Sequence, residues 1–340
     1  MKREFKLTAA LLAMLSGTAM AQSNVTIFGS LDAMATRFTG STAGVNSNDK
    51  AVKKLDGGGL ATSHFGVRGS EDLGDGAAAI FELSGFLRND TGQSGRNDAI
   101  GAPVNVAADP MWSRAAWVGL SSKSLGRLRL GNGTSLLFIN SITSNAFVDS
   151  TVFSPINLVT FIGSPLSGGT GWTNQIMIDS ANFAGFSASA SVSACEGQGG
   201  RNAAARVSYA ANAAGISFAY QNVKKNPVTF ADGTSSNNAK AWQVAGSYDF
   251  NVVKVFAHVG RIHNDGTEAA PLNIGYRIWD LSASVPISTA TFSPATHRAP
   301  PATPWAPCQP PGRAATRSAR CSRSATTTSC RSARTSTRWS

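Results

Sequence analysis

Arginine residues recur on the polar phase of segments in which apolar and polar residues alternate. In GRLRLG, Leu128 and Leu130 fall on one side of an extended chain and the two arginines on the other, because successive strand side chains point to opposite faces. The same reasoning gives one polar set: Arg68, Glu82, Arg88, Arg114, Arg127 and Arg129. Guanidinium groups gathered on one surface can attract and orient anions.

The segments that carry these side chains have the residue pattern of β-strands. In AWQVAGSYDF, Trp242, Val244 and Tyr248 share one face, whereas Gln243 and Ser247 share the other. The segments GFSASASVS, VVKVFAHVG and IWDLSASV repeat this alternation, and about thirteen such segments precede Ser288. No convincing amphipathic helix competes with them, so the sequence predicts an all-β fold.

Two β architectures fit this alternation, a soluble sandwich and a membrane barrel with its apolar face toward lipid. The polar phase here is rich in Ser, Asn and Gln, and Trp and Tyr recur near segment ends, as membrane interfaces require. Long and short connectors also alternate: the stretches to about Leu60, over 89–110 and over 132–171 are long, whereas EDLGDG and SSKSLG are short. These features favour a transmembrane antiparallel β-barrel.

Charge and cysteine divide the chain. The net charge is +11, but residues 23–288 carry nineteen basic and eighteen acidic residues, whereas residues 289–340 carry eight arginines and no acid. Three of the four cysteines also lie in this last stretch, which leaves Cys195 alone in the body without a disulfide partner. Residues 1–21 combine a basic start, a short apolar run and Ala19-Met20-Ala21, which predicts a signal peptide and export to the periplasm.

Four segments carry a family resemblance. VTIFGSLDA, SHFGVRGSEDLGDGAAAIFELSGF, SRAAWVGLSSKSLGRLRLG and ANFAGFSASA resemble the landmark strands of the general diffusion porins of β-proteobacteria. The resemblance implies a sixteen-stranded antiparallel barrel over residues 22–288 and a homotrimer. It also implies that the third long loop, here residues 132–171, folds into the lumen as a constriction. This loop departs from the common family pattern because it lacks a Pro-Glu-Phe-Gly-type acidic motif.

The function that this resemblance implies is passive transport. We expect a water-filled outer-membrane channel for small hydrophilic solutes and ions, in contact with outer-membrane lipid and lipopolysaccharide, with no enzymatic activity, no cofactor and no nucleic-acid partner. A metal site is not expected, because His258 and His263 are five residues apart and fall on opposite faces of a strand. The alternative is a surface barrel that acts mainly as an adhesin or structural protein, and conductance in planar bilayers separates the two.

Strand alternation then predicts the residues that line the pore. Ala115 and Trp117 would face lipid and Arg114 the lumen, and a charged side chain facing lipid at mid-membrane costs about 2–4 kcal/mol. The arginines therefore predict a basic wall opposite the inserted loop, whose ionisable side chain Asp149 supplies the opposing charge. This wall predicts a mild preference for anions. Alternatively, some arginines only solvate the barrel mouth, and Arg68 pairs with Glu71 or Asp72.

Residues 289–340 do not continue the alternation. Seven of the fourteen prolines lie after Ser288, and Ala, Arg, Ser, Thr and Pro dominate. A frameshift near Ser288 is one hypothesis for this Arg/Ser/Pro-rich segment, and a naturally disordered tail is the other. Under the first hypothesis the C-terminal barrel strands are missing. The unpaired sheet edge would then lie in lipid, so we expect the chain as written to assemble poorly.

Overall fold

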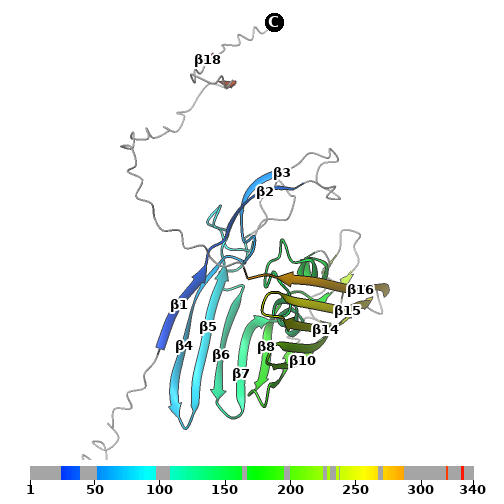
Figure 1. The fold of residues 1–340 in the computed structure, drawn as a ribbon. Coiled ribbons are helices and arrows are strands. Elements are labelled where there is room, and N and C mark those ends of the chain that lie inside the picture. The colour runs from blue at the N-terminus through cyan, green and yellow to red at the C-terminus, as the bar shows by residue number, and fades with distance from the viewer. Residues whose placement is uncertain are drawn as a thin grey trace, which may run out of the picture. The chain divides into compact units, whose positions relative to one another are not determined.

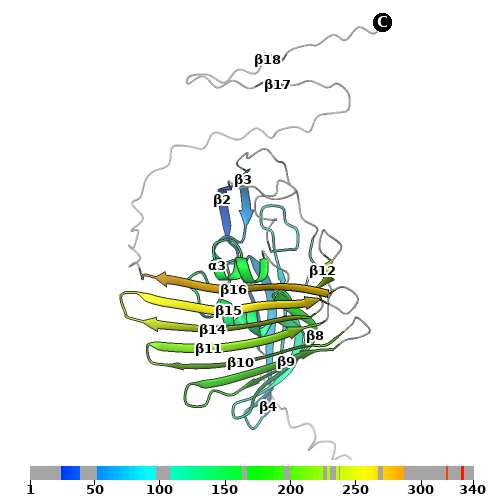
Figure 2. The same ribbon diagram turned by 90° about the vertical axis from the view of Figure 1, so that its right-hand side faces the viewer.

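The predicted antiparallel β fold is confirmed by the structure, a computed structural model. It describes residues 24–38, 52–96, 108–162, 167–194, 200–224, 228–229, 235–236, 238–266, 271–286, 319–320 and 331–332. One sheet of 12 strands dominates these residues (Figures 1 and 2). Its strands, in spatial order, are β1 (Asn24–Ser30), β4 (His64–Gly74), β5 (Ala77–Phe86), β6 (Ala115–Ser122), β7 (Gly126–Thr134), β8 (Gly171–Ser180), β9 (Phe186–Ser193), β10 (Asn202–Ala211), β11 (Ala214–Val223), β14 (Ala239–Asp249), β15 (Lys254–Gly266) and β16 (Pro271–Ser284).

The remaining strands form three small two-stranded pairs. These are β2 (Ala33–Phe38) with β3 (Val52–Gly57), β12 (Val228–Thr229) with β13 (Ser235–Ser236), and β17 (Ala319–Arg320) with β18 (Arg331–Ser332). The chain divides into two compact units at Ser288, so β17 and β18 belong to a unit of their own. The expected signal peptide, residues 1–21, and Cys195 lie outside the described residues.

The connections of the main sheet alternate between short and long, as the sequence predicts. Short turns join β4 to β5, β6 to β7, β8 to β9, β10 to β11 and β14 to β15. The connections at the opposite ends of these strands include the long β5–β6 and β7–β8 segments, but the one between β15 and β16 has only four residues. Three of the short turns place Asp75, Asn212 and Asn251 at positive φ (51°, 49° and 69°), which the short polar side chains of Asp and Asn tolerate better than most. These five turns gather at one end of the sheet, as short turns do in outer-membrane barrels.

The two faces of the sheet differ as expected, with apolar side chains on the outer face. On β15, Phe256, His258 and Ile262 are buried on the inner face, which carries the helices, whereas Val259 between them is 52% exposed. On β16, Trp279 and Leu281 are exposed and Asp280 between them is buried. Large apolar side chains that are exposed along one continuous face are expected where the face of a sheet contacts lipid rather than water.

One strand has the opposite phase to the sequence interpretation. Ala115 is buried, Trp117 lies opposite Glu82 in the β5–β6 register, and Val118 and Leu120 are more than half exposed. Ala115 and Trp117 therefore face inward, and the expectation that they face lipid is wrong. Both phases of the segment AAWVGL are apolar, so alternation does not decide between them, and Val118 and Leu120 supply the outward side chains.

The connection from β7 to β8 packs against the inner face of the sheet. It contains helices α2 (Leu136–Ile142) and α3 (Pro155–Asn157) and the π-helical turn η1 (Leu158–Ile162). Ser135 caps α2, because its hydroxyl accepts a hydrogen bond from the Phe138 amide. The helix then contacts β9, β10, β11 and β14. The segment occupies the inner side of the sheet, where the family resemblance implies a constriction.

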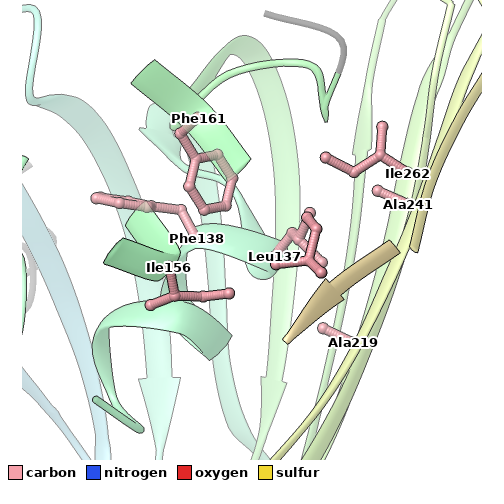
Figure 3. Packing of buried hydrophobic residues seen from close by; sticks show 8 residues of the cluster. Leu137, Phe138, Ile156, Phe161, Ala219, Ala241 and Ile262 are labelled. Atoms are coloured by element: carbon pink, nitrogen blue, oxygen red, sulfur yellow. The ribbon is translucent and has the colours of Figure 1, made fainter. Parts of the chain in front are cut away.

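A hydrophobic cluster fixes this loop to the sheet (Figure 3). Phe138 and Phe161 from the loop meet edge to face, with ring centroids 4.9 Å apart, and Leu137 points toward the strands. The cluster consists of Leu137, Phe138, Ile156 and Phe161 from the loop and Ala219, Ala241, Ile262 and Ile278 from β11, β14, β15 and β16. The inner face of these strands is thus apolar where the loop covers it, an exception to the polar inner phase.

Candidate pore-lining site

A hollow on the inner face gathers charged residues from strands and loops. We call it the loop-side hollow; it has a volume of 580 Å³, and its charged lining is Arg88, Arg96, Arg114, Asp109 and Asp149. Phe138 and Ile142 of α2 line it as well. The arrangement places three cationic groups beside the inserted loop, with two carboxylates in the same space. It can therefore hold polar solutes in a strong local field.

Arg114 reaches this hollow from just before β6. Its Nη1 lies 3.1 Å from Glu82 Oε1 and 3.3 Å from Ser84 Oγ, both on β5. The inward placement was predicted, but the reason given was wrong, because Ala115 faces inward too. Arg114 lies outside the regular strand, so alternation does not fix the direction of its side chain.

Arg88 is the most enclosed of the predicted arginines. Its side chain is 2% exposed, and Nη1 donates to Gln93 Oε1 at 3.4 Å. Gly95, at φ 142°, passes so close that a Cβ there would lie 2.6 Å from Arg88 Nε. Arg88 thus lines the hollow and also packs the start of the β5–β6 connection, so it has a structural role beside any role in transport.

Arg96 was missed by the sequence interpretation. Its Nη2 donates to Thr170 Oγ1 at 2.7 Å, and its guanidinium carbon lies 4.4 Å from the Phe86 ring centroid and 5.6 Å from that of Phe138. Burial lowers the pKa of Arg96 to about 10, while the carboxylates of Asp109 and Asp149 act in the opposite direction. Arg96 is still cationic at neutral pH. It lies in a long connection without alternation, so no periodic signal marks it.

The loop residue Asp149 also lies where it faces the arginines. It lines the loop-side hollow and its charge acts on Arg96, and its backbone oxygen accepts a hydrogen bond from Thr62 Oγ1 at 3.4 Å. The preceding residue, Val148, has a positive φ of 49°, which reverses the chain at this point. The acidic side chain is therefore held by a tight backbone turn on the inserted loop.

A second hollow lies closer to the short turns. We call it the turn-side hollow; it has a volume of 340 Å³, and Arg68, Arg127 and Glu82 supply its charges. Arg68 lies opposite Glu82 in the β4–β5 register, and its guanidinium carbon is 5.0 Å from the Phe28 ring centroid. Within the described residues no ion pair joins Arg68 to Glu71 or Asp72.

Arg127 and Arg129 share an acidic partner that the sequence interpretation missed. Asp179 Oδ2 on β8 lies 2.6 Å from Arg129 Nη2 and 3.7 Å from Arg127 Nη2. Ser189 Oγ donates to the other carboxylate oxygen at 2.8 Å, and Arg129 lies over the Trp117 ring at 5.4 Å. The alternation of Ile176 and Ile178 with inward residues could have placed Asp179 on this face.

The inserted loop is also held by polar contacts from the opposite wall. Arg206 on β10 donates from Nε to Asn140 Oδ1 at 3.2 Å and from Nη2 to Thr143 Oγ1 at 3.3 Å. His258 Nε2 on β15 donates to the Ser144 carbonyl oxygen at 2.6 Å. These two side chains fix the end of α2 at the wall, in addition to the hydrophobic cluster.

Among the described residues, no group of three or more His, Cys, Asp or Glu residues is placed to hold a metal ion. His258 is buried on the inner face and His263 pairs with Asp265 at 2.7 Å, on the opposite face of β15. In a separate observation, no described helix is long and apolar enough to cross a membrane.

The fold and the hollows together define the class: an outer-membrane β-barrel protein with charged groups and an inserted loop on its inner face. A family model for Gram-negative porins matches residues 8–299. The chain belongs to the Gram-negative porin family, which confirms the sequence-based assignment. It is accordingly a protein of the outer membrane, in a family of channels rather than enzymes.

Two curated relatives and two solved structures illustrate the match. The chain is 28% identical over 279 residues to an outer membrane porin protein of Bordetella pertussis, covering 73% of this chain and 66% of that protein. It is 32% identical over 184 residues to outer membrane porin protein 32 of Delftia acidovorans, covering 51% and 44%. The anion-selective porin from Comamonas acidovorans has a TM-score of 0.63 at 22% identity, covering 78% of this chain and 75% of that one. The trimer form of OmpT from Vibrio cholerae has a TM-score of 0.55 at 12% identity, covering 78% and 73%.

Proposed function

We propose that the chain forms a water-filled channel for passive diffusion of small hydrophilic solutes and ions. The observation that carries this proposal is the loop-side hollow, where charged side chains of the wall face a loop that is packed onto the inner face of the sheet. An active transporter would need an energy-coupling site, whereas a diffusion channel needs only a polar passage lined by fixed charges. The described residues supply a polar hollow lined by fixed charges.

We further propose a mild preference for anions. In the loop-side hollow three arginines face two aspartates, and in the turn-side hollow two arginines face one glutamate. With Arg129 and the shared Asp179 added, six arginines stand against four acids on this part of the inner face, and the two excess positive charges raise the local concentration of anions. The fold similarity to an anion-selective porin supports this reading.

Passage of ions through planar bilayers tests both statements. We expect discrete conductance steps and a reversal potential, in a KCl gradient, of the sign that chloride preference gives. Replacing Arg96 and Arg114 by Gln should shift the reversal potential toward cation preference, whereas K123Q, in the short turn between β6 and β7, should leave it unchanged. Absence of any conductance from protein inserted in the bilayer would reject the channel and favour a surface barrel acting as an adhesin.

Assembly as a homotrimer is part of the same proposal. Its support is that a structure with the same fold was solved as a trimer. We expect small hydrophilic solutes and ions as the transported partners and outer-membrane lipid around the outer face. Chemical cross-linking of protein in outer-membrane extracts tests the trimer. Cross-linked products no larger than one subunit would count against it.

The ends of the chain carry two further proposals. Residues 1–21 are proposed as a signal peptide, and N-terminal sequencing of the exported protein tests the cleavage before Gln22. Residues 289–340 are proposed as a segment outside the barrel that arose by a frameshift near Ser288. Support comes from its composition and from the division of contacts at Ser288. Sequencing the coding DNA across residues 285–295 tests this, because an intact reading frame would favour a natural disordered tail.

A further inference from the structure

An aspartate just after the first strand has both carboxylate oxygens bonded to backbone amides. Asp32, in the segment VTIFGSLDA, follows β1 at the point where the chain leaves the main sheet. Its Oδ1 accepts a hydrogen bond from the Gly59 amide at 3.0 Å, and its Oδ2 accepts one from each of the amides of Leu60 and Ala61 at 2.9 Å. Hydrogen bonds to an ionised acceptor are about twice as strong as those between neutral groups. Asp32 therefore fixes the conformation of residues 58–62, which we call the Asp32 turn.

The Asp32 turn is anchored next to the main sheet and to the segment that carries Arg96. The Asp32 amide donates to Ser63 Oγ at 2.9 Å, and the Ser63 hydroxyl donates to the Asp32 carbonyl oxygen at 3.0 Å. Ser63 is fully buried and directly precedes β4. Gly58, at φ 74°, passes so close to Arg96 that a Cβ there would lie 3.1 Å from the Arg96 carbonyl oxygen. The turn thus packs against the backbone of Arg96.

The Asp32 turn also contacts the inserted loop around Asp149. The hydroxyl of Ser150, a fully buried residue, donates to the Gly59 carbonyl oxygen at 2.7 Å. Thr62 Oγ1 donates to the Asp149 carbonyl oxygen at 3.4 Å. Asp149 and Arg96 line the same loop-side hollow. One turn therefore touches the backbone at an arginine and at an aspartate whose side chains face the same space.

Contacts inside the inserted loop hold the same bend. Asn157 Nδ2 donates to the carbonyl oxygens of Val148 at 3.0 Å and Ser150 at 2.9 Å, on either side of Asp149. These bonds shape the bend but move with the loop, because donor and acceptors all belong to it. The bonds to the Asp32 turn, in contrast, connect the bend to the segment that carries Arg96. The separation of the two opposite charges therefore depends on this turn.

We propose that Asp32 is a positioning residue for ion selection, because through the Asp32 turn it sets the place of Asp149 relative to Arg96. Asp32 is not among the residues that line the loop-side hollow, so its effect on permeating ions acts through Asp149. The energy between two charges falls as their distance grows, so a displaced Asp149 neutralises less of the arginine charge. The inference rests on the proposed channel function and names a residue that tunes its selectivity.

Reversal potentials in a KCl gradient across planar bilayers, measured on the full chain, test this link. Asp32→Asn places an amide donor against the backbone amides of the turn, so we expect the reversal potential to shift toward stronger anion preference. Asp149→Asn removes the acid itself and should shift it in the same direction by at least as much. D32N/D149N should match D149N alone, because two changes that act through one residue are not additive.

Two further variants separate position from charge. Thr62→Val keeps every charge but removes the hydrogen bond to the Asp149 carbonyl oxygen, and should give a smaller shift of the same sign as D32N. Because T62V retains Asp32, it tests the link even where D32N does not insert. Asp72→Asn is the matched control: its carboxylate accepts a hydrogen bond from the Gly74 amide at 2.9 Å, at the β4–β5 turn. D72N should leave the reversal potential unchanged.

Two results would overturn the role of Asp32. The first is a wild-type reversal potential in D32N, or in T62V where D32N does not insert. The second is an equal shift by D32N in the wild-type and D149N backgrounds, which would identify Asp32 as a direct source of charge in the passage. Absence of conductance in wild type and in every variant would reject the channel itself, and with it this role, so the two failures are distinguishable.

Discussion

The two walls of the sheet place their arginines on opposite faces. On β4 to β7 the arginines point inward and lie near acids, as in the contacts of Arg127 and Arg129 with Asp179. On β15 and β16, the inner face is apolar where Ile262 and Ile278 receive the loop, and Arg261 and Arg277 point outward. The comparison teaches that in this sheet the strand phase decides the surroundings of a charge, which are the inner face on one wall and the outer face on the other. Four substitutions probe this difference.

Leu137→Ala should have the largest effect, because it attacks the attachment of the loop to the apolar wall. Leu137 is fully buried between α2 and the strands, and a Leu→Ala change at such a site costs about 2–5 kcal/mol. A loosened loop should widen the passage and raise single-channel conductance. Val159→Ala, which shortens an exposed side chain of the same loop, is the control. Conductance unchanged in L137A would contradict the view that this cluster sets the width of the passage.

Ala257→Arg should come next, because it places a charge in the apolar part of the outer face. Ala257 lies on the outward phase of β15 between Val255 and Val259, four residues before Arg261 on the same face. An arginine facing mid-membrane costs about 2–4 kcal/mol. The measurement is urea unfolding in lipid vesicles, with Ser247→Arg, on the inward phase of β14 opposite Gly215 and Phe256, as the control. Equal stability of both variants would mean that the outer face of β15 does not contact hydrocarbon.

The sequence predicted the strand phases well where alternation was continuous and poorly where it was not. Arg127, Arg129 and Arg68 lie on the inner face because each sits inside a regular strand with apolar neighbours on both sides. Trp117 was assigned to the wrong face because both phases of its segment are apolar, and the outward side chains are those of Val118 and Leu120. Arg96 could not be predicted, since its contacts with Thr170 and Phe138 join two connections, β5–β6 and β7–β8, that are distant in sequence.

Asp179→Asn tests the balance of charge on the inner wall. The substitution keeps the shape of the side chain but leaves Arg127 and Arg129 without their shared carboxylate, and hydrogen bonds to a charged group contribute about 1.5–3 kcal/mol. The free energy of unfolding should fall by no more than this, because Arg127 is largely exposed and solvent screens it. The reversal potential should shift toward stronger anion preference. Asp75→Asn, in the turn between β4 and β5, removes the same charge outside the hollows and should cause neither change.

Arg277→Gln should have the smallest effect and the opposite sign. In detergent without lipid, Arg261 and Arg277 face each other across β15 and β16, so removing one charge should stabilise the sheet by about 0.2–1 kcal/mol. Arg277→Lys keeps the charge and should leave the repulsion in place. Urea unfolding of wild type, R277Q and R277K in detergent measures the difference. A loss of stability in R277Q would show that the arginine already has a favourable partner in the protein, and the two walls would then differ less than the registers indicate.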